Sequence, residues 1–471
     1  MMKIIRIVFV LVISCIIGIC LLNFNFEPNS ISEIDNRELA DFPIPGAEDM
    51  DYTEAVDNYV SDRIGFRTEA IDAFTWLNDK LFGEMIHPTY TYGKDGYIFF
   101  KMPDEDYDIA WMDAFIEFLV DIQTYCEERD VPFIFWLDPA KITVYSEYLP
   151  NGYNYTGAGL SYLIQRLDEA QINYVNTTNL LIEKSKSEQV FNIKYDAGHW
   201  NDLGAFYATN TVLEKMQEYF PGIHQNTFED FYRTTEHVTS LMVSHFPIDE
   251  EIPVFQNIQE DNIISLKNDY SALKLNKNYR NIDVLLNTKA TEDLPKVLFF
   301  QGSYMNGRRK FLESRIKEYD SIHNYENILN FDYYFNIFQP DCVIFETAEY
   351  TVNGNYFDYE TMQNVDFNPA LSRFDLYKEN EASDVINILY QENGNITDVC
   401  LEGQVAEADY AYLKSGDVIV DLKKGKSEEE YTASFDNTIF ETQKTTLILI
   451  NNSSEIKSVY PVAWVPMEVL D

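Results

Sequence analysis

Short apolar runs that alternate with helical patterns constrain the fold of this chain most strongly. The runs VPFIFWLD (131–138) and PDCVIFETAEY (340–350) are largely apolar, as expected of strands buried on both faces of a sheet. Residues 108–130 repeat apolar side chains at intervals of three and four, and a second helical pattern spans about 203–219. Strands that alternate with helices predict a mostly parallel sheet covered on both faces.

Four further segments are expected in the same α/β domain, which we place at residues 51–380. The motif YGKDGYIFF (92–100) has a glycine-flanked turn that feeds an aromatic run, and this pattern predicts a hairpin. Residues 220–293 are less regular and mostly polar, so we interpret them as an insertion over the sheet. The run PKVLFF (295–300) predicts a strand, and LESRIKEY (312–319) predicts a helix after it.

The character of the sequence changes after about residue 385. Short segments of alternating polarity, such as GDVIVDLKKG (416–425) and KTTLILINNS (444–453), are separated by Gly and Asn turns. This pattern predicts a small β-sandwich over residues 385–471, and carbohydrate binding is a candidate role for it. A chain of 471 residues is also longer than one ordinary domain, which favours two.

The N-terminus carries a targeting signal. Lys3 and Arg6 precede the apolar run IVFVLVISCIIGICLLNF (7–24), which is long enough to cross a bilayer and lacks an Ala-x-Ala-like cleavage site. We therefore predict a signal anchor at residues 1–24 with a short cytoplasmic tip, so that the rest of the chain is extracytoplasmic. A cleaved signal peptide is the alternative and gives the same compartment. Residues 25–50, polar and punctuated by prolines, are expected to form a stalk.

Charge and cysteine content exclude some classes of protein. The net charge of −43 argues against a nucleic-acid partner, because phosphate binding requires clusters of Lys and Arg. The five cysteines show no C-x-x-C spacing outside the apolar segment, so neither a zinc knuckle nor a dense disulfide framework is indicated.

Ser303 is the candidate nucleophile. It follows the expected strand that ends at Phe300, after Gly302, which permits a tight turn. A residue there lies at the carboxyl edge of a parallel sheet, where open α/β folds bind ligands. A serine hydroxyl is a weak nucleophile that requires a base. The alternative role for Ser303 is to cap a helix.

The stretch YDAGHWNDLGAF (195–206) supplies a candidate base and acid. Asp196 and His199 are three residues apart before a predicted helix, so the carboxylate can orient one ring nitrogen while the other faces a serine. Two alternatives remain, a structural hydrogen bond in a turn and a metal site formed with Asp202. The second lacks another histidine at ligand spacing.

Seven motifs occur together in one order: DNRELADFP (35–43), YVSDRIGFR (59–67), YGKDGYIFF (92–100), LDPAKITVYSEYLP (137–150), DAGHWNDLGA (196–205), GSYMN (302–306) and PDCVIFETAEY (340–350). With these motifs the chain resembles the SGNH/GDSL-like O-acetyltransferase domains of exopolysaccharide assembly, the AlgX/AlgJ and DHHW group, from about residue 33 to 350. The resemblance implies an SGNH-like three-layer α/β/α fold. It also implies a triad of Ser303 as nucleophile, His199 as base and Asp196 as orienting acid.

Two departures from the family pattern are present. Gln-Gly-Ser replaces the frequent Gly-Asp-Ser at the nucleophile, and two residues rather than one separate the acid from the histidine. The remaining candidates for the oxyanion or substrate-binding site are Gly302, Tyr304, Asn306, Trp200 and Arg308. Turn packing is the alternative for Tyr304 and Asn306, shielding of the histidine for Trp200, and a solvated helix face for Arg308.

The resemblance implies an extracytoplasmic O-acyltransferase that transfers an acyl group, expected to be acetyl, to a cell-surface polysaccharide through an acyl-serine. It implies no metal and no cofactor. Cytoplasmic acetyl-CoA does not reach this compartment, so the expected donor partner is a multi-spanning membrane acyltransferase. Two alternatives are a carbohydrate acetyl esterase with the same triad and a non-catalytic glycan-binding or scaffold protein.

Overall fold

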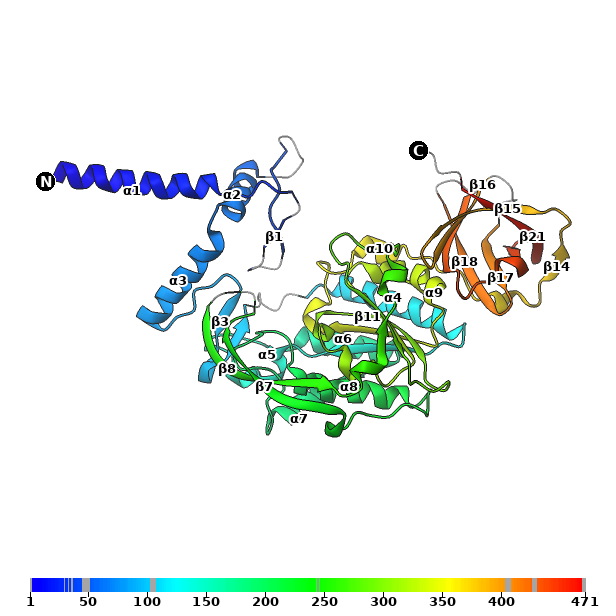
Figure 1. Cartoon of the computed structure of the whole chain (residues 1–471), viewed down its shortest axis with the longest axis horizontal. Helices are drawn as coiled ribbons and strands as arrows, with labels where there is room; N and C mark the ends of the chain where they lie inside the picture. Colours follow the sequence, from blue (N-terminus) through cyan, green and yellow to red (C-terminus); the bar gives the residue numbers. More distant parts are fainter. Residues whose placement is uncertain are drawn as a thin grey trace.

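The computed structural model shows three regions in a row (Figure 1). Helix α1 (Met2–Leu22) projects from one end, a layered α/β region lies in the middle, and a β-barrel lies at the other end. The structure describes residues 2–28, 30–32, 34, 37–44, 51–101, 107–242, 244, 246–402, 408–425 and 430–467. Part of the expected stalk, residues 45–50 among others, therefore lies outside the described residues.

A seven-stranded sheet forms the centre of the α/β region. Its order is β6 (Tyr174–Asn176), β5 (Phe133–Asp138), β13 (Cys342–Ala348), β11 (Lys296–Gln301), β12 (Glu318–His323), β10 (Ile282–Asn287) and β9 (Ile263–Ser265). The first five strands are mutually parallel, and β10 and β9 extend the sheet in antiparallel register. The carboxyl ends of the parallel strands consequently share one edge.

Alternate side chains of the central strands enter two separate cores. Phe135 and Phe345 point into one core with α4 (Ile109–Glu127), α6 (Ala158–Glu169) and α9 (Phe331–Phe338). Trp136 and Ile344 point into the other with α7 (Thr178–Ser185) and α8 (Asp202–Met216). Because strand side chains alternate between faces, a sheet with two apolar faces needs helices on both. The predicted three-layer α/β/α fold is confirmed.

Two expectations for the middle of the chain are wrong. The helix expected at 312–319 is absent: short 3₁₀ turns at Ser303–Met305 and Arg309–Phe311 lead into β12. Residues from Lys296 to Gln301 pair in parallel with β12, and this pairing overrides the local helical pattern. The segment 220–293 is only partly an insertion over the sheet, because it also supplies β9 and β10 to the sheet itself.

Smaller elements surround the amino-terminal side of this domain. The hairpin predicted at 92–100 is present as β3 (Tyr90–Tyr92) and β4 (Ile98–Phe100), and a longer hairpin joins β7 (Phe231–Ser240) to β8 (Pro247–Asn257). The same side holds α2 (Tyr52–Arg63), α3 (Arg67–Phe82), α5 (Lys141–Val144) and the strand pair β1 (Ile31–Ser32) and β2 (Arg37–Glu38), whereas α10 (Tyr359–Gln363) packs against α4 (Figure 1).

The expected C-terminal β-domain is confirmed, and its strands close into a sandwich-like barrel. The strands are β15 (Ile386–Asn393), β16 (Ile396–Glu402), β17 (Tyr410–Ser415), β18 (Val418–Lys424), β19 (Glu430–Asp436), β20 (Thr445–Asn451) and β21 (Ile456–Pro466), with β14 (Lys378–Glu381) outside them. Closure occurs because β21 pairs with both β15 and β20. A closed sheet has few unpaired edges, which limits edge-to-edge association.

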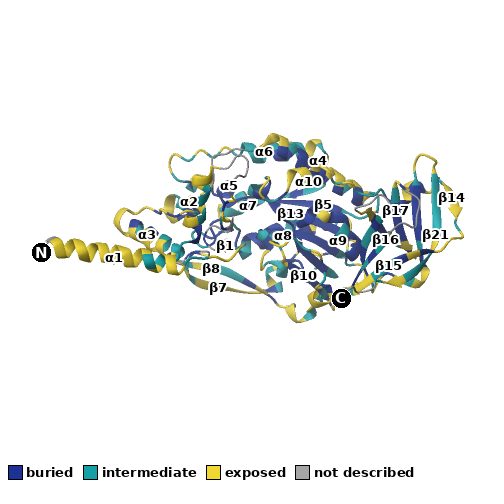
Figure 2. Ribbon diagram, turned by 90° about the horizontal axis from the view of Figure 1, so that it is seen from above, coloured by how far each residue is buried: buried dark blue, intermediate teal, exposed yellow. Residues whose placement is uncertain are grey.

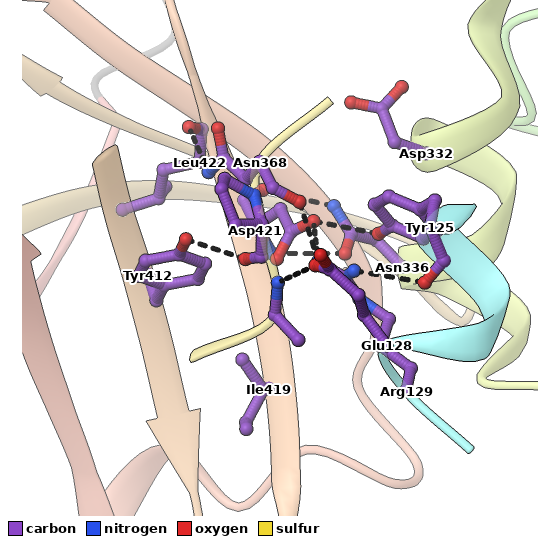
Figure 3. A network of polar contacts seen from close by, with 12 residues as sticks. Tyr125, Glu128, Arg129, Asp332, Asn336, Asn368, Tyr412, Ile419, Asp421 and Leu422 are labelled. Atoms are coloured by element: carbon purple, nitrogen blue, oxygen red, sulfur yellow. Dashed lines mark hydrogen bonds and ion pairs between the residues drawn. The ribbon is translucent and has the colours of Figure 1, made fainter. Parts of the chain in front are cut away.

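Buried polar contacts join the barrel to the α/β domain (Figure 3). Arg129, after α4, contacts the Asp421 carboxylate of β18 at 2.8 Å, and the Tyr125 hydroxyl donates to the same carboxylate at 2.7 Å. Asn336 of α9 pairs with the Asp421 backbone in both directions, at 2.9 and 3.0 Å. Burial raises the pKa of Asp421 to about 6, and Arg129 opposes this rise. The ion pair therefore compensates a carboxylate that the interface has removed from water.

We expect Arg129→Met to destabilise the full-length protein by about 3 kcal/mol, because it leaves Asp421 buried without its cation. Arg373→Met is the matched control. Arg373 contacts Glu128 at 3.0 Å across the same interface but is 60% exposed, so its loss should cost less than about 1 kcal/mol. Urea denaturation measures both free energies of unfolding. Equal values for the two variants would contradict a stabilising role of the buried pair.

Candidate active site

The sequence-predicted serine and histidine lie on two loops at the carboxyl edge of the parallel sheet. Ser303 begins the 3₁₀ turn that directly follows β11, and His199 lies in the loop that precedes α8. The cap of the serine turn is Gly302, so Ser303 is not a helix cap. The sheet thus brings together two residues that are 104 positions apart in the chain.

Asp196, His199 and Ser303 form a continuous hydrogen-bonded chain. His199 Nδ1 lies 2.7 Å from Asp196 Oδ1, and His199 Nε2 lies 2.9 Å from Ser303 Oγ. An ionised carboxylate only accepts hydrogen bonds, so Nδ1 carries the proton of the neutral ring and Nε2 accepts from the serine hydroxyl. This tautomer leaves the nitrogen that faces Ser303 able to take its proton.

Asp196 is held in an unusual backbone conformation. Its φ of 53° lies in the left-handed region, which Asp tolerates better than most residues. Its carboxylate accepts from the backbone N–H of His199 at 3.0 Å and of Gly198 at 3.4 Å. Burial acts to raise the pKa of Asp196, but the His199 ring, Arg308 and the backbone donor outweigh burial, and the pKa lies below its ordinary value. The acid is therefore ionised at neutral pH.

Tyr304 and Trp200 link the two loops and do not line the cleft, contrary to the role considered for them. Both side chains are fully buried. The Tyr304 hydroxyl donates to the carbonyls of Gly198 at 2.7 Å and Pro139 at 3.0 Å, and Trp200 Nε1 donates to the Tyr304 carbonyl at 2.9 Å. A ring without solvent exposure cannot stack on a sugar, so these residues fix the loops relative to each other.

Gly302 and Arg308 also have structural contacts rather than the predicted ones. The Gly302 N–H donates to the buried Glu346 carboxylate and so points into the protein, away from a developing oxyanion. Arg308 donates to the carbonyls of Trp200 at 2.6 Å and Asn306 at 2.9 Å, which fastens the serine turn to the histidine loop. Asn306 is exposed beside the turn and is the remaining predicted candidate near the opening.

A metal site made of Asp196, His199 and Asp202 is not supported by the geometry. Asp202 accepts from the backbone N–H of Phe255 at 2.8 Å and from the Lys310 ammonium. The Asp202 carboxylate is thus already engaged by these two donors, next to α8 and β8. Among the described residues, no group of three or more metal-ligating side chains gathers anywhere.

A buried carboxyl pair, Asp138 and Glu346, lies directly beneath the serine turn. Asp138 is the last residue of β5, Glu346 lies in the adjacent strand β13 opposite Trp136, and both are fully buried. Burial raises the pKa of Asp138 well above its ordinary value, and Glu346 adds to the rise; burial also raises the pKa of Glu346 to about 7. Burial and the neighbouring Glu346 both favour the protonated form of Asp138, and the Glu346 carboxylate accepts the Gly302 N–H.

This arrangement explains the glycine before the nucleophile. A Cβ at position 302 would lie 3.1 Å from Glu346 Oε1 and 3.2 Å from Oε2. Both distances are shorter than ordinary van der Waals contact, so a larger residue would displace either the carboxylate or the serine turn. Lys141, which begins α5, is buried and donates to the carbonyls of Ile98 at 2.8 Å and Ile193 at 3.0 Å. Burial lowers its pKa to about 7.

Two tyrosines beside the serine were missed by the sequence analysis. The Tyr350 hydroxyl lies 3.5 Å from His199 Nε2, and Tyr325 is almost fully buried nearby. Burial raises the pKa of both phenols, while a hydrogen bond with Ser303 lowers each. No spacing rule could have found them, because they come from loops after β13 and β12 that only the fold brings to the serine.

A groove of about 740 Å³ opens next to these tyrosines. Aromatic and aliphatic side chains, glycines and polar side chains line it, including Tyr107, Trp111, Tyr153, Tyr155, Tyr350, Tyr356, Met112, Ile142, Leu160, Leu163, Val352, Asn353, Asn355, Asp108 and Glu349. Among the described residues of the lining, two are carboxylates and none is Lys, Arg or His. Tyr350 therefore contacts both the histidine and the groove.

The α/β domain is similar to an SGNH hydrolase-like domain. Residues 91–256 match the family model ALGX, described as an SGNH hydrolase-like domain, acetyltransferase AlgX. This match confirms the resemblance that the motifs indicated. It includes Asp196 and His199 and ends before Ser303, so the serine is connected to the pair by the structure alone. None of the curated proteins matches the chain.

Solved structures with a similar arrangement include PatB1 of Bacillus cereus, at 18% identity and a TM-score of 0.45, covering 55% of this chain and 96% of that one. The O-acetyltransferase domain of Pseudomonas putida AlgJ matches at 13% identity and a TM-score of 0.41, covering 59% and 99%. Pseudomonas aeruginosa AlgX matches at 14% identity and a TM-score of 0.40, covering 79% and 89%.

We expect Glu346→Gln to flatten the dependence of stability on pH. The pKa of Glu346 is about 7 in the folded protein and 4.5 ordinarily, so its contribution is fully present below pH 4.5 and is lost as pH rises through 7. The loss is on the order of 3 kcal/mol. Gln removes the titration but keeps an acceptor for Gly302. Urea denaturation between pH 4.5 and 8 measures the difference.

The exposed Glu229 provides the control for this measurement, because Glu229→Gln removes a carboxylate that is not buried. The control should retain the pH dependence of the wild-type protein. If Glu346→Gln retained it as well, the buried pair would not be the source of the effect.

Proposed function

We propose that this protein is an extracytoplasmic serine O-acyltransferase that transfers an acyl group, acetyl in the simplest case, to a hydroxyl of a cell-surface polysaccharide. The observation that carries the proposal is the hydrogen-bonded chain from Asp196 through His199 to Ser303. The match of residues 91–256 to an acetyltransferase family supports the same reaction class.

In the first half-reaction, His199 Nε2 takes the proton of Ser303 as Oγ attacks the acyl carbonyl carbon of the donor. The imidazolium, stabilised by Asp196, then protonates the leaving group as its bond to the acyl carbon breaks. The N–H groups at the start of the Ser303–Met305 turn are suited to stabilise the oxyanion, because the first N–H groups of a helical turn have no partner within it. The product is an acyl ester on Ser303.

In the second half-reaction, a sugar hydroxyl gives its proton to His199 and attacks the acyl-serine. The ester bond to Ser303 breaks, and the proton returns to the serine oxygen. Tyr350 is well placed to position the acceptor hydroxyl, because it lies 3.5 Å from His199 Nε2 and lines the groove. Water in place of the sugar would give an esterase, so the acceptor decides between the two reactions.

The groove supports a neutral glycan as acceptor. Aromatic rings provide apolar faces for sugar rings, and amide and carboxylate groups provide hydrogen bonds for hydroxyls. The two carboxylates, without a cation among the described lining residues, disfavour uronate or phosphate groups. The net charge of −43 acts in the same direction.

Location and donor complete the proposal. The segment Lys3–Leu22 is apolar and long enough to cross a membrane, which is compatible with a single-pass anchor or a signal sequence. With an anchor, the site is held outside the cytoplasm, and a multi-spanning membrane acyltransferase is the proposed source of the acyl group. No step of the mechanism requires a metal or another cofactor.

We expect Ser303→Ala to lower the release of nitrophenol from p-nitrophenyl acetate by about 10³-fold or more, and Asp196→Asn by a similar factor through the wrong tautomer. Mass spectrometry should detect an acetyl ester on Ser303 in the wild-type protein and in the control Ser372→Ala, an exposed serine. Wild-type rates in Ser303→Ala would instead favour a non-catalytic glycan-binding protein.

We expect acetylated sugar to accumulate only when a neutral acceptor oligosaccharide is present with the acyl donor. An oligouronate of equal length should be a poorer acceptor by at least about tenfold, which corresponds to about 1.4 kcal/mol of repulsion. Chromatography of the products measures both transfers. Ester hydrolysis that is unaffected by any acceptor would identify an esterase, and a preference for the oligouronate would refute the neutral-glycan assignment.

A further inference from the structure

Helix α3 (Arg67–Phe82) has its apolar face turned toward solvent. Phe74, Leu77 and Leu81 lie on one side of the helix at intervals of three and four, and they are 54%, 47% and 63% exposed. Trp76 lies on a neighbouring side of the helix, about 100° from Leu77, and is 46% exposed, and Phe82 at the end of the helix is 68% exposed. The exposed charges Glu69 and Lys80 lie at the margins of the apolar face, where long side chains can extend toward water.

The opposite side of α3, which contacts the rest of the protein, is polar. Thr75 and Asn78 are buried there, and the Thr75 hydroxyl donates to the Ile86 carbonyl at 2.8 Å. Asp72 accepts from the Ser244 hydroxyl at 2.7 Å, and Asp79 accepts from the Tyr92 hydroxyl at 2.9 Å. A helix on a water-exposed surface has the reverse arrangement, with its apolar stripe against the core. The polarity of α3 is therefore that of a helix whose outer face meets an apolar phase.

The position of α3 identifies this phase. The turn between α2 and α3 contacts the carboxyl end of α1, where the Gly65 N–H donates to the Cys20 carbonyl at 3.2 Å. The buried Arg63 donates to the Glu27 carbonyl at 2.6 Å, and the Asn25 N–H donates to the Arg63 carbonyl at 2.8 Å. The two helices thus diverge from one junction, and the far end of α3 leans back toward the side from which α1 comes (Figure 1).

We propose that α3 lies in the interfacial layer of the lipid leaflet from which α1 emerges, with Phe74, Leu77 and Leu81 among the acyl chains. The occupant of the apolar face is lipid rather than protein, because α3 diverges from the junction with α1 toward the side from which α1 comes, and both helices expose large apolar side chains there; most residues of both helices are coloured as exposed in Figure 2. Trp76, on the flank, lies at the level of the headgroups, where tryptophan is favoured.

This second membrane contact has a consequence for catalysis. A single spanning helix leaves the domain behind it free to rotate and tilt, whereas a second contact at an angle to the first restricts both motions. The polar bonds of Asp72 and Asp79 connect α3 to the β7–β8 region and to β3, which adjoin the histidine loop. The active site is thereby held in one orientation to the membrane that supplies its acyl group. The inference rests on the proposed membrane anchor.

The test uses the full-length chain in phosphatidylcholine vesicles, with and without brominated acyl chains, which quench tryptophan fluorescence by contact. The chain has five tryptophans. Trp111, Trp136 and Trp200 are buried in the α/β domain, and Trp464 lies in the barrel. We expect brominated lipid to quench a component of the emission that Trp76→Phe removes and that the matched control Trp464→Phe retains. Phe keeps the face apolar, so the variant should fold as the wild type does.

Flotation of the vesicles at alkaline pH separates the two proposals. A chain that does not float lacks the anchor, and the proposed location fails with this inference. A chain that floats but shows equal quenching in the wild type and Trp76→Phe refutes the lipid contact alone. In that case the occupant of the apolar face is a second copy of the chain or a protein partner that the vesicles lack.

Discussion

The reciprocal contacts between the serine turn and the histidine loop carry the whole site. Tyr304 reaches the carbonyl of Gly198, and Trp200 reaches back to the carbonyl of Tyr304, at 2.7 and 2.9 Å. Both side chains are excluded from water, so these hydrogen bonds do not compete with solvent. Because these bonds fix the two loops relative to each other, the backbone keeps His199 and Ser303 in position for the 2.9 Å contact between Nε2 and Oγ.

The buried carboxyl pair beneath the site also holds the serine turn in place, although burying two acidic groups is electrostatically unfavourable. A buried carboxyl pair is unfavourable unless one member keeps its proton, and Asp138 does so beside Glu346. In return, Glu346 accepts the Gly302 N–H and fixes the backbone immediately before the nucleophile. Titratable groups are thus buried at two places where segments distant in the chain are held together. One is the serine turn, and the other is the junction with the barrel, where Arg129 pairs with Asp421.

The domain order places each part of the proposed reaction in a different physical environment. The two helices at the N-terminal end present apolar side chains outward, the central domain contains the serine and its groove, and the barrel lies beyond it (Figure 1). A donor in the membrane and a polysaccharide outside it would approach from different sides. The groove lined by Tyr350 lies beside the site at the sheet edge.

The sequence alone determined the fold class and the three residues of the candidate triad. Apolar periodicity reports burial directly, so the parallel sheet, the hairpin at 92–100 and the β-rich end followed from it, and the order of the motifs indicated Ser303, His199 and Asp196. Only the tertiary structure decided the direction of each neighbouring side chain. Trp200 and Gly302 were predicted to line the site, yet the Trp200 side chain and the Gly302 N–H point into the protein. Tyr350, in contrast, reaches the site from a distant loop. Strand pairing also replaced the helix expected at 312–319. Periodicity records how deeply a residue is buried, whereas contacts between distant segments depend on how the strands are ordered in the sheet, which no local pattern encodes.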